Sequence, residues 1–297
     1  MAGNIPFSRD FECEYGKIYQ LSPLIRRITV ENPGPFTFRG TNSYIIGRGE
    51  VAVIDPGPVD EAHMDALLHG LGNERISHIF LTHTHRDHSP GAAPLKAKSG
   101  APTYAFGPHL NIKTSGKQLD DGGDTDFVPD FEMKDGQAVA GKGWTLEAVH
   151  TPGHISNHLC FSLREENVLF TGDHVMGWST SVIAPPWGNM GDYFASLEKL
   201  LARHDALYWP AHGGEVRRPR TLTRALIAHR RMREAAVIER LKAGDRRISQ
   251  MVTQLYEGID PRLHFAAGLS VQGHLEHLIE RGIAGYAPEA QDEFILL

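Results

Sequence analysis

The segment from Leu81 to His88 places four side chains that can bind metal ions within six residues. His83, His85, Asp87 and His88 supply imidazole and carboxylate groups, which suit zinc and neighbouring divalent ions. So short a segment cannot surround one tetrahedral ion well, but it can supply ligands to two ions. A separation of about 3.5–4 Å between ions is typical of two-metal hydrolases. The spacing therefore predicts a dinuclear metal site.

Three further candidate ligands each follow an apolar, strand-like run and lie in a turn that contains glycine or proline. They are His154 in Thr-Pro-Gly-His, Asp173 in Thr-Gly-Asp and His212 in Pro-Ala-His-Gly. Loops held by a rigid scaffold commonly carry functional side chains. Burying these polar groups without a metal would leave several of them unsatisfied. We therefore expect seven metal ligands, of which Asp87 and Asp173 also take part in catalysis.

Two bound divalent ions would make this chain a hydrolase. Such an ion lowers the pKa of a bound water from near 16 to about 7, so that a metal-bound hydroxide forms at neutral pH, and it polarises a carbonyl or phosphoryl oxygen. No separate nucleophile is needed, and the sequence contains no Gly-x-Ser-x-Gly elbow. Zinc is the expected metal, with manganese and iron as alternatives. His158 and His174 lie beside ligands, and we expect them to pack behind the site rather than donate a proton to substrate.

Short strands and amphipathic helices must position these ligands. Apolar residues at intervals of three and four predict helices over 60–71 and 192–203. Strands outnumber helices and often follow one another directly, which favours a layered α/β sandwich over a doubly wound parallel sheet. β-Branched and aromatic runs bounded by turn residues predict the strands 28–30, 44–46, 51–54, 79–81, 159–163, 168–170 and 207–209.

The composition changes near Glu215. Residues 215–247 hold eleven Lys and Arg against four Asp and Glu, although the whole chain carries a net charge of −6. The pattern beyond this point predicts a hydrolase domain over 1–215 and a small helical module over 216–297. The module's expected elements are helices ending at Gly244, Gly258 and Gly282 and a terminal hairpin of 283–286 and 294–297. The first helix is expected to bury Ala228, Met232, Ala235, Ile238 and Leu241.

The order of these candidate ligands and the short sequences that flank them resemble those of the metallo-β-lactamase superfamily, in particular its glyoxalase II-like branch. The resemblance covers about residues 17–215. It implies a four-layer αββα sandwich in which two divalent ions are bound. It also implies that one ion is held by His83, His85 and His154, that the other is held by Asp87, His88 and His212, and that Asp173 bridges them. Zinc β-lactamases typically carry a cysteine where Asp173 stands, which disfavours antibiotic hydrolysis.

A narrower resemblance concerns the segment from Asn32 to Tyr44. This segment is similar to the entry segment of the β-lactamase-like protein 2 subfamily, which also carries a C-terminal winged-helix-like module. Animal members of that subfamily are endoribonucleases that cleave single-stranded RNA. The resemblance therefore implies an RNA phosphodiesterase as the leading activity.

Other functions remain open at this stage. One alternative is a small-molecule acyl hydrolase, either a thioesterase of the hydroxyacylglutathione type or a lactonase, and Trp178 and Trp187 favour an apolar acyl substrate. Another is a non-catalytic, metal-stabilised protein that binds nucleic acid, and a third is an iron oxidoreductase on the same ligand frame. The arginines of the basic stretch 217–247 either contact phosphates or form a solvated helix face with Glu234 and Glu239 as counter-charges.

The overall composition excludes several other classes of protein. Two cysteines, Cys13 and Cys160, are too few for a disulfide scaffold or for a zinc site built from cysteine pairs. The chain has no apolar run long enough to cross a bilayer and no signal-like N-terminus, so we expect a cytoplasmic protein. The segment 109–129 is rich in aspartate and lacks periodicity, which predicts a flexible acidic loop. The oligomeric state cannot be predicted from these features.

Overall fold

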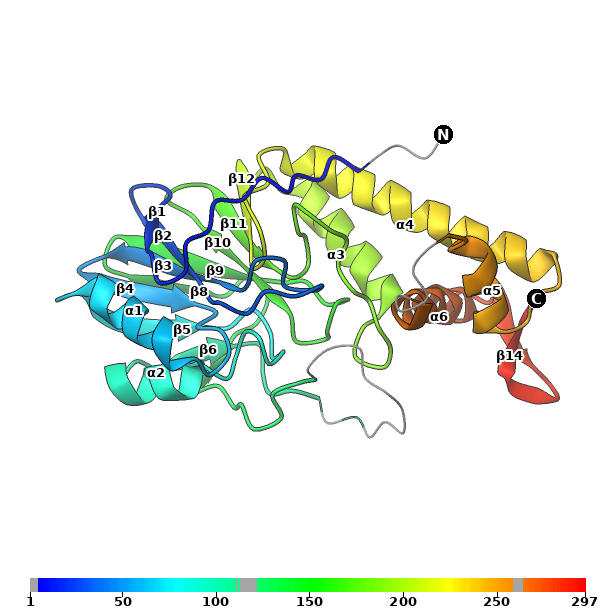
Figure 1. The fold of residues 1–297 in the computed structure, drawn as a ribbon, viewed down its shortest axis with the longest axis horizontal. Coiled ribbons are helices and arrows are strands. Elements are labelled where there is room, and N and C mark those ends of the chain that lie inside the picture. Colours follow the sequence, from blue (N-terminus) through cyan, green and yellow to red (C-terminus); the bar gives the residue numbers. More distant parts are fainter. Residues whose placement is uncertain (1–4, 111, 113–121, 259–263) are drawn as a thin grey trace.

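Two β-sheets stack face to face in the larger part of the chain (Figure 1). The computed structural model describes residues 5–110, 112, 122–258 and 264–297, and the statements below concern these residues. The first sheet has the order β1-β2-β3-β4-β5-β6-β7, and the second has the order β12-β11-β10-β9-β8. The first sheet comprises β1 (Tyr19–Gln20), β2 (Ile25–Thr29), β3 (Asn42–Arg48), β4 (Glu50–Ile54), β5 (Arg75–Phe80), β6 (Thr103–Ala105) and β7 (Phe131–Glu132). The second comprises β8 (Ala138–Gly141), β9 (Trp144–His150), β10 (Leu159–Leu163), β11 (Val168–Gly172) and β12 (Leu207–Pro210).

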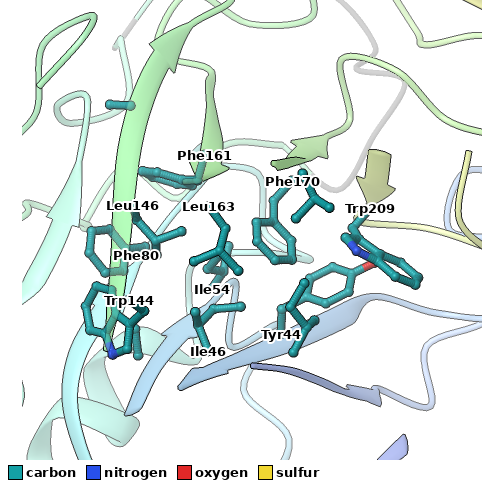
Figure 2. Packing of buried hydrophobic residues seen from close by; sticks show 14 of the residues in the cluster. Tyr44, Ile46, Ile54, Phe80, Trp144, Leu146, Phe161, Leu163, Phe170 and Trp209 are labelled. Carbon is teal, nitrogen blue, oxygen red and sulfur yellow. The ribbon is translucent and has the colours of Figure 1, made fainter. Parts of the chain in front are cut away.

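Alternation along the strands builds the core between the sheets. In β3, Tyr44 and Ile46 pack toward the second sheet, whereas Ile45 between them packs toward the helices outside. Figure 2 shows Tyr44 and Ile46 lying below Leu163 and Phe170, which come from the facing strands. Because both faces of each sheet are covered, whole strands such as β10 and β11 are buried. Fully buried strands appear in the sequence as continuous apolar runs, which is why these two were predicted.

Helices cover the outer face of each sheet and complete four layers (Figure 1). Helices α1 (Glu61–Leu71) and α2 (Ala92–Ser99) pack on the first sheet, with Met64, Leu67 and Leu95 among the contacts. Helices α3 (Met190–Ala202) and α4 (Pro219–Lys242) pack on the second. The expected αββα sandwich is therefore confirmed.

The C-terminal residues form a smaller unit at the far end of α4 (Figure 1). Helices α5 (Ile248–Leu255) and α6 (His264–Glu280) and the hairpin of β13 (Ala284–Ala287) and β14 (Ala290–Leu296) share a core with the end of α4. Helix α4 thus contributes to two hydrophobic cores, one on the second sheet and one in this unit. The boundary at residue 215 stays a prediction.

The structure corrects the sequence analysis in three places. Helix α4 begins at Pro219, earlier than the apolar stripe suggested, and Ala228, Met232 and Ala235 face solvent. Ile238 and Leu241 pack in the core of the C-terminal unit as expected, but the buried face also carries the charged residues Arg230 and Glu234. Consequently Glu234 is not a counter-charge on a solvated face. Several elements were not predicted because they are short or mixed in polarity, namely β1, α2, β6, β7, β8 and β9.

Two further findings bear on the sequence analysis. The predicted acidic loop over 109–129 includes residues 111 and 113–121, which lie outside the described residues. No helix within the described residues is long and apolar enough to cross a membrane.

Candidate metal centre

All seven predicted ligands meet at one edge of the sandwich, where strands of both sheets end. The segment 83–88 follows β5 of the first sheet. His154 follows β9, Asp173 follows β11 and His212 follows β12 of the second sheet. Residues more than 120 positions apart are therefore brought together by the stacking of the two sheets.

Three histidines form the first group. The Nε2 atom of His83 lies 3.0 Å from Nδ1 of His85, and this Nδ1 lies 2.9 Å from Nε2 of His154. All three imidazoles are buried. Three nitrogen atoms converging at this spacing, from rings that lie nearly perpendicular to one another, form a face that one cation can bind.

Asp87, His88 and His212 form the second group. The Oδ2 atom of Asp87 lies 3.3 Å from Nε2 of His88 and 3.2 Å from Nε2 of His212. Asp173 lies between the two groups, because its Oδ1 is 3.2 Å from His212 Nε2 while its Oδ2 is 3.7 Å from His154 Nε2. The two oxygens of one carboxylate thus face two different groups of ligands.

The donor atoms at this centre fit a pair of cations. The Nε2 atoms of His88 and His212 and the Oδ1 atom of Asp173 are buried and make no directed hydrogen bond with any described residue. Orphaned polar atoms of this kind are costly to bury and are rare without an unseen partner. Imidazole nitrogens and carboxylate oxygens are donors suited to zinc, manganese and iron. The residues present therefore fit two divalent ions.

The ring nitrogens that point away from the centre are held by the protein. Asp55 Oδ2 lies 3.0 Å from His88 Nδ1, and the carbonyls of Val182 and Gly40 lie 2.6 Å and 3.1 Å from Nδ1 of His154 and His212. Such outer contacts fix the tautomer and the ring orientation of metal-binding histidines.

Asp55 was missed by the sequence analysis. Its carboxylate also accepts hydrogen bonds from the backbone N–H and the hydroxyl of Thr82, both at 2.7 Å. The available signal was its position directly after the apolar run of β4, before a Pro-Gly turn. Asp55 contributes to the site by fixing the first residues after β5, which carry the ligands.

The electrostatics of the centre divide the histidines into two kinds. Burial and the neighbouring imidazoles hold the pKa of His83 well below its usual value. Burial also acts to lower the pKa of His88 and His212, but the carboxylates Asp87 and Asp173 outweigh it. They raise the pKa of His88 well above its usual value and that of His212 to about 10. Cations binding there would take the place of these protons.

His158 and His174 lie behind the ligands, as we expected. His158 Nδ1 is 2.9 Å from the Thr151 hydroxyl, and its Nε2 accepts a hydrogen bond of 3.2 Å from the backbone N–H of Asp173. His174 is fully buried, and its ring packs edge-on against Tyr193. Neither imidazole lines the cavity above the centre, so neither faces a substrate there.

Glycines allow the backbone to place two of the ligands. Gly172, before Asp173, has a φ of +49°, and a Cβ there would lie 2.5 Å from His158 Nε2. Gly153, before His154, has a φ of +137°, and a Cβ there would lie 2.5 Å from the Cα of Tyr193. Only glycine satisfies both the backbone conformation and the close packing at these turns.

A cavity of about 440 Å³ opens above the centre. Its floor includes His85, Asp87, His154 and Asp173, and one wall is the segment 32–37. The side chain of Asp87 is 22% exposed. This is more than the exposed fraction of the side chains of His88, His154, Asp173 and His212. A substrate in this cavity would therefore meet the Asp87 side of the centre.

Known proteins match the two parts of the chain separately. The model of the metallo-beta-lactamase superfamily matches residues 36–212, and that of the beta-lactamase associated winged helix domain matches residues 248–289. Lactamase-like protein adaB of Aspergillus niger is 32% identical over 294 residues, covering 90% of this chain and 87% of adaB. Atrochrysone carboxyl ACP thioesterase AgnL7 of Paecilomyces divaricatus is 38% identical over 202 residues, covering 67% of this chain and 58% of AgnL7.

Solved structures share the fold over nearly the whole chain. A beta-lactamase domain protein from Burkholderia ambifaria superposes with a TM-score of 0.78 at 18% sequence identity. The match covers 97% of this chain and 96% of that protein. At this identity the likeness concerns the fold alone.

Proposed function

This chain belongs to the metallo-β-lactamase superfamily, and from that premise we propose that it hydrolyses acyl thioesters at a two-metal site. The observation that carries the proposal is the placement of Asp173 between two groups of ligands. Relatives named as acyl carrier protein thioesterases favour the acyl substrate over RNA.

We assign the ligands according to these two groups. His83, His85 and His154 would hold one ion and Asp87, His88 and His212 the other, with Asp173 shared. When bound, a pair of divalent ions polarises a carbonyl group and lowers the pKa of a water. Zinc is our first choice of metal, because it suits imidazole-rich sites, and iron or manganese would be accepted by the same donors.

Asp87 is the residue we place closest to the reacting atoms. The pKa of its carboxyl is held well below the usual value, because the imidazoles of His88 and His212 outweigh the effect of burial. Asp87 is therefore an anion at neutral pH, and it can orient the attacking water and accept its hydrogen bond. In the reaction water forms a C–O bond to the acyl carbon, the C–S bond breaks and the thiol sulfur takes a proton.

RNA cleavage, our leading prediction from the sequence, has less support. Several arginines of the basic stretch already have partners within the protein. Arg217 pairs with Glu215 and Arg231 with Glu198, while Arg230 is buried. Arginines engaged in this way are less available to neutralise phosphates.

A substrate panel tests the proposal. The purified protein is incubated with acyl thioesters, acyl lactones and single-stranded RNA, and thiol, acid and oligonucleotide products are measured. We expect thioester hydrolysis that Asp87→Asn lowers by at least roughly 100-fold. Asp65→Asn, which changes an exposed carboxylate on α1, serves as the matched control and retains activity. Cleavage of RNA with no release of thiol would overturn the proposal.

A further inference from the structure

A second and larger cavity lies next to the metal centre. It measures about 650 Å³ and lies between the loop 178–183 and helices α4 and α6. It shares Pro35, Phe36, Met176 and Val182 with the cavity above the ligands, so the two cavities are direct neighbours. A substrate that occupied both cavities would extend from the metal centre toward the C-terminal unit.

The walls of the second cavity suit a flat apolar group. Phe36, Trp178 and Tyr256 line it from three separate parts of the chain, together with Ile183 and Leu255. Trp178 is fixed in place by stacking on Phe38, with ring centroids 4.9 Å apart. Aromatic side chains of this kind stack on planar groups and bury a large apolar area. The cavity volume is sufficient for an aromatic acyl group.

Polar donors without partners occur within these apolar walls. Arg230 is only 4% exposed, and its Nε makes no hydrogen bond with any described residue. The same holds for Nε1 of Trp178. Arg230 contacts the carbonyl of Ser181, to which its Nη2 donates a hydrogen bond, and Tyr193, whose ring lies 5.4 Å away. None of these partners is an anion.

The charge in the cavity is consequently unbalanced. Among the described residues, no carboxylate forms an ion pair with Arg230 or Arg233. The guanidinium group of Arg233 lies over the ring of Tyr256, 4.2 Å from its centroid. Glu257 also lines the cavity, but its side chain is at the exposed mouth. A buried cation without a counter-charge is costly unless an anion completes the site. Carboxylates match the planar donor geometry of a guanidinium group.

We propose that this second cavity binds the acyl part of the substrate and that Arg230 and Arg233 recognise a carboxylate on that acyl group. The inference rests on the proposed thioester hydrolysis and adds the substrate class: an aromatic acyl group with an acidic substituent. It also gives the C-terminal unit a role, because α4, α5 and α6 supply one side of the binding site.

Matched substrates test this assignment. We would compare N-acetylcysteamine thioesters of 3-(4-carboxyphenyl)propanoic acid and of its 4-carboxamide, which differ in charge but scarcely in shape. We expect kcat/KM to favour the carboxylate by roughly 10- to 100-fold, the range of a charge-assisted hydrogen bond. Arg233→Gln should remove most of this preference. Arg224→Gln, an exposed change on the same helix, should leave the preference intact.

Binding provides a readout that does not need turnover. The corresponding amides, with NH in place of the thioester sulfur, are titrated into the protein in a calorimeter. The inference is supported if the carboxylate amide binds more tightly than the carboxamide and if Arg233→Gln abolishes this difference, even when thioesters are not substrates. A failure to release thiol, by contrast, counts only against the proposed function. Trp178→Phe is the second variant, because it removes one orphaned N–H and keeps the stacked ring.

Two results would overturn the inference. The first is equal activity and equal binding of carboxylate and carboxamide in the unmodified protein. The second concerns the thiol part of the substrate, tested with the coenzyme A thioester of the same acid. If Arg233→Gln impairs the coenzyme A thioester but not the N-acetylcysteamine thioester, the arginines recognise the phosphate of the carrier arm instead of an acyl carboxylate.

Discussion

Asp55 shows how much of this site depends on a residue that binds no metal in our assignment. Its carboxylate receives three contacts, two from Thr82 and one from His88. Through them it fixes both the beginning of the ligand segment and the ring of one ligand. Loss of such an outer contact typically lowers metal affinity 10- to 100-fold.

We therefore expect Asp55→Asn to weaken zinc binding by about 10- to 100-fold, because an amide cannot accept as strongly from Thr82 and His88. The affinity is measured by competition with a chromophoric chelator. Asp65→Asn on the surface of α1 is the control and should bind as the unmodified chain does. An unchanged affinity in Asp55→Asn would show that His88 needs no support from this carboxylate.

A second residue-scale prediction concerns Gly172. Alanine there must adopt a φ near +49° and place its Cβ within 2.5 Å of His158. His158 would be displaced from the backbone of Asp173, so we expect a loss of about 1–3 kcal/mol in stability together with lower metal content. Urea unfolding and elemental analysis measure the two effects.

Gly136→Ala measures the cost of a left-handed backbone conformation without any steric clash of the new Cβ. Its φ is +75°, but nothing lies within 4 Å of a Cβ built there. This variant should lose only the roughly 1–2 kcal/mol of left-handed strain and keep its metal. If both variants behave alike, close packing at Gly172 does not position Asp173.

The seven candidate ligands could be singled out from sequence because their spacing and the turns that flank them are local properties. The support for them could not, since Asp55, Gly40 and Val182 reach the ligands only through the tertiary fold. The pairing of Asp87 with His212, 125 positions later in the chain, likewise followed only from the resemblance until the strands were placed.

At the scale of elements, α4 departs most from the expected pattern. Hydrophobic periodicity identified the helix and correctly placed Ile238 and Leu241 in a core, but it missed that the buried face includes the charged residues Arg230 and Glu234. Glu234 lies 2.6 Å from His277 and 2.7 Å from Arg281, both in or just after α6. Ionic contacts therefore join these helices where an apolar stripe was expected.

Glu234→Gln should lower stability by about 1–3 kcal/mol, since the buried carboxylate that pairs with the half-buried His277 and with Arg281 is lost. The ordinary pKa of the glutamate carboxyl is 4.5, and it is lowered to about 2 in the folded protein; burial opposes this shift, and His274 and His277 outweigh it. A carboxyl whose pKa is lower in the folded than in the unfolded protein stabilises the fold at pH values above its unfolded-state pKa. This stabilisation is lost as the pH falls through its folded-state pKa.

The difference in unfolding free energy between the unmodified chain and Glu234→Gln should therefore be constant above about pH 5 and shrink as the pH falls toward 3. Glu239→Gln, an exposed substitution on the same helix, should show little difference at any pH. A difference that grows on acidification would contradict the ionic account of the contact between α4 and α6.

At the scale of the whole molecule, the layered architecture was predictable and the path of its edge strands was not. Strands β10 and β11 are continuous apolar runs, whereas β8 (Ala138–Gly141) is short and largely exposed. The two cavities lay beyond prediction, because the loop 178–183, α4 and α6 come together only in three dimensions.

Metal removal should affect the entire sandwich. The ligands come from both sheets, so bound ions connect β5 with β9, β11 and β12. Because ligands that bind only the folded state stabilise it, we expect the Tm to fall when the metals are chelated and to recover when zinc is added back. Scanning calorimetry checks this, and a Tm indifferent to chelation would mean that the ions contribute nothing to the fold.

The central claim is that two divalent ions share Asp173, and metal quantification tests it most directly. Elemental analysis of the purified protein, after removal of loosely bound metal, should find two divalent ions per chain, and Asp173→Asn should reduce this number. At most one ion in the unmodified protein, or two ions that remain in Asp173→Asn, would contradict the account.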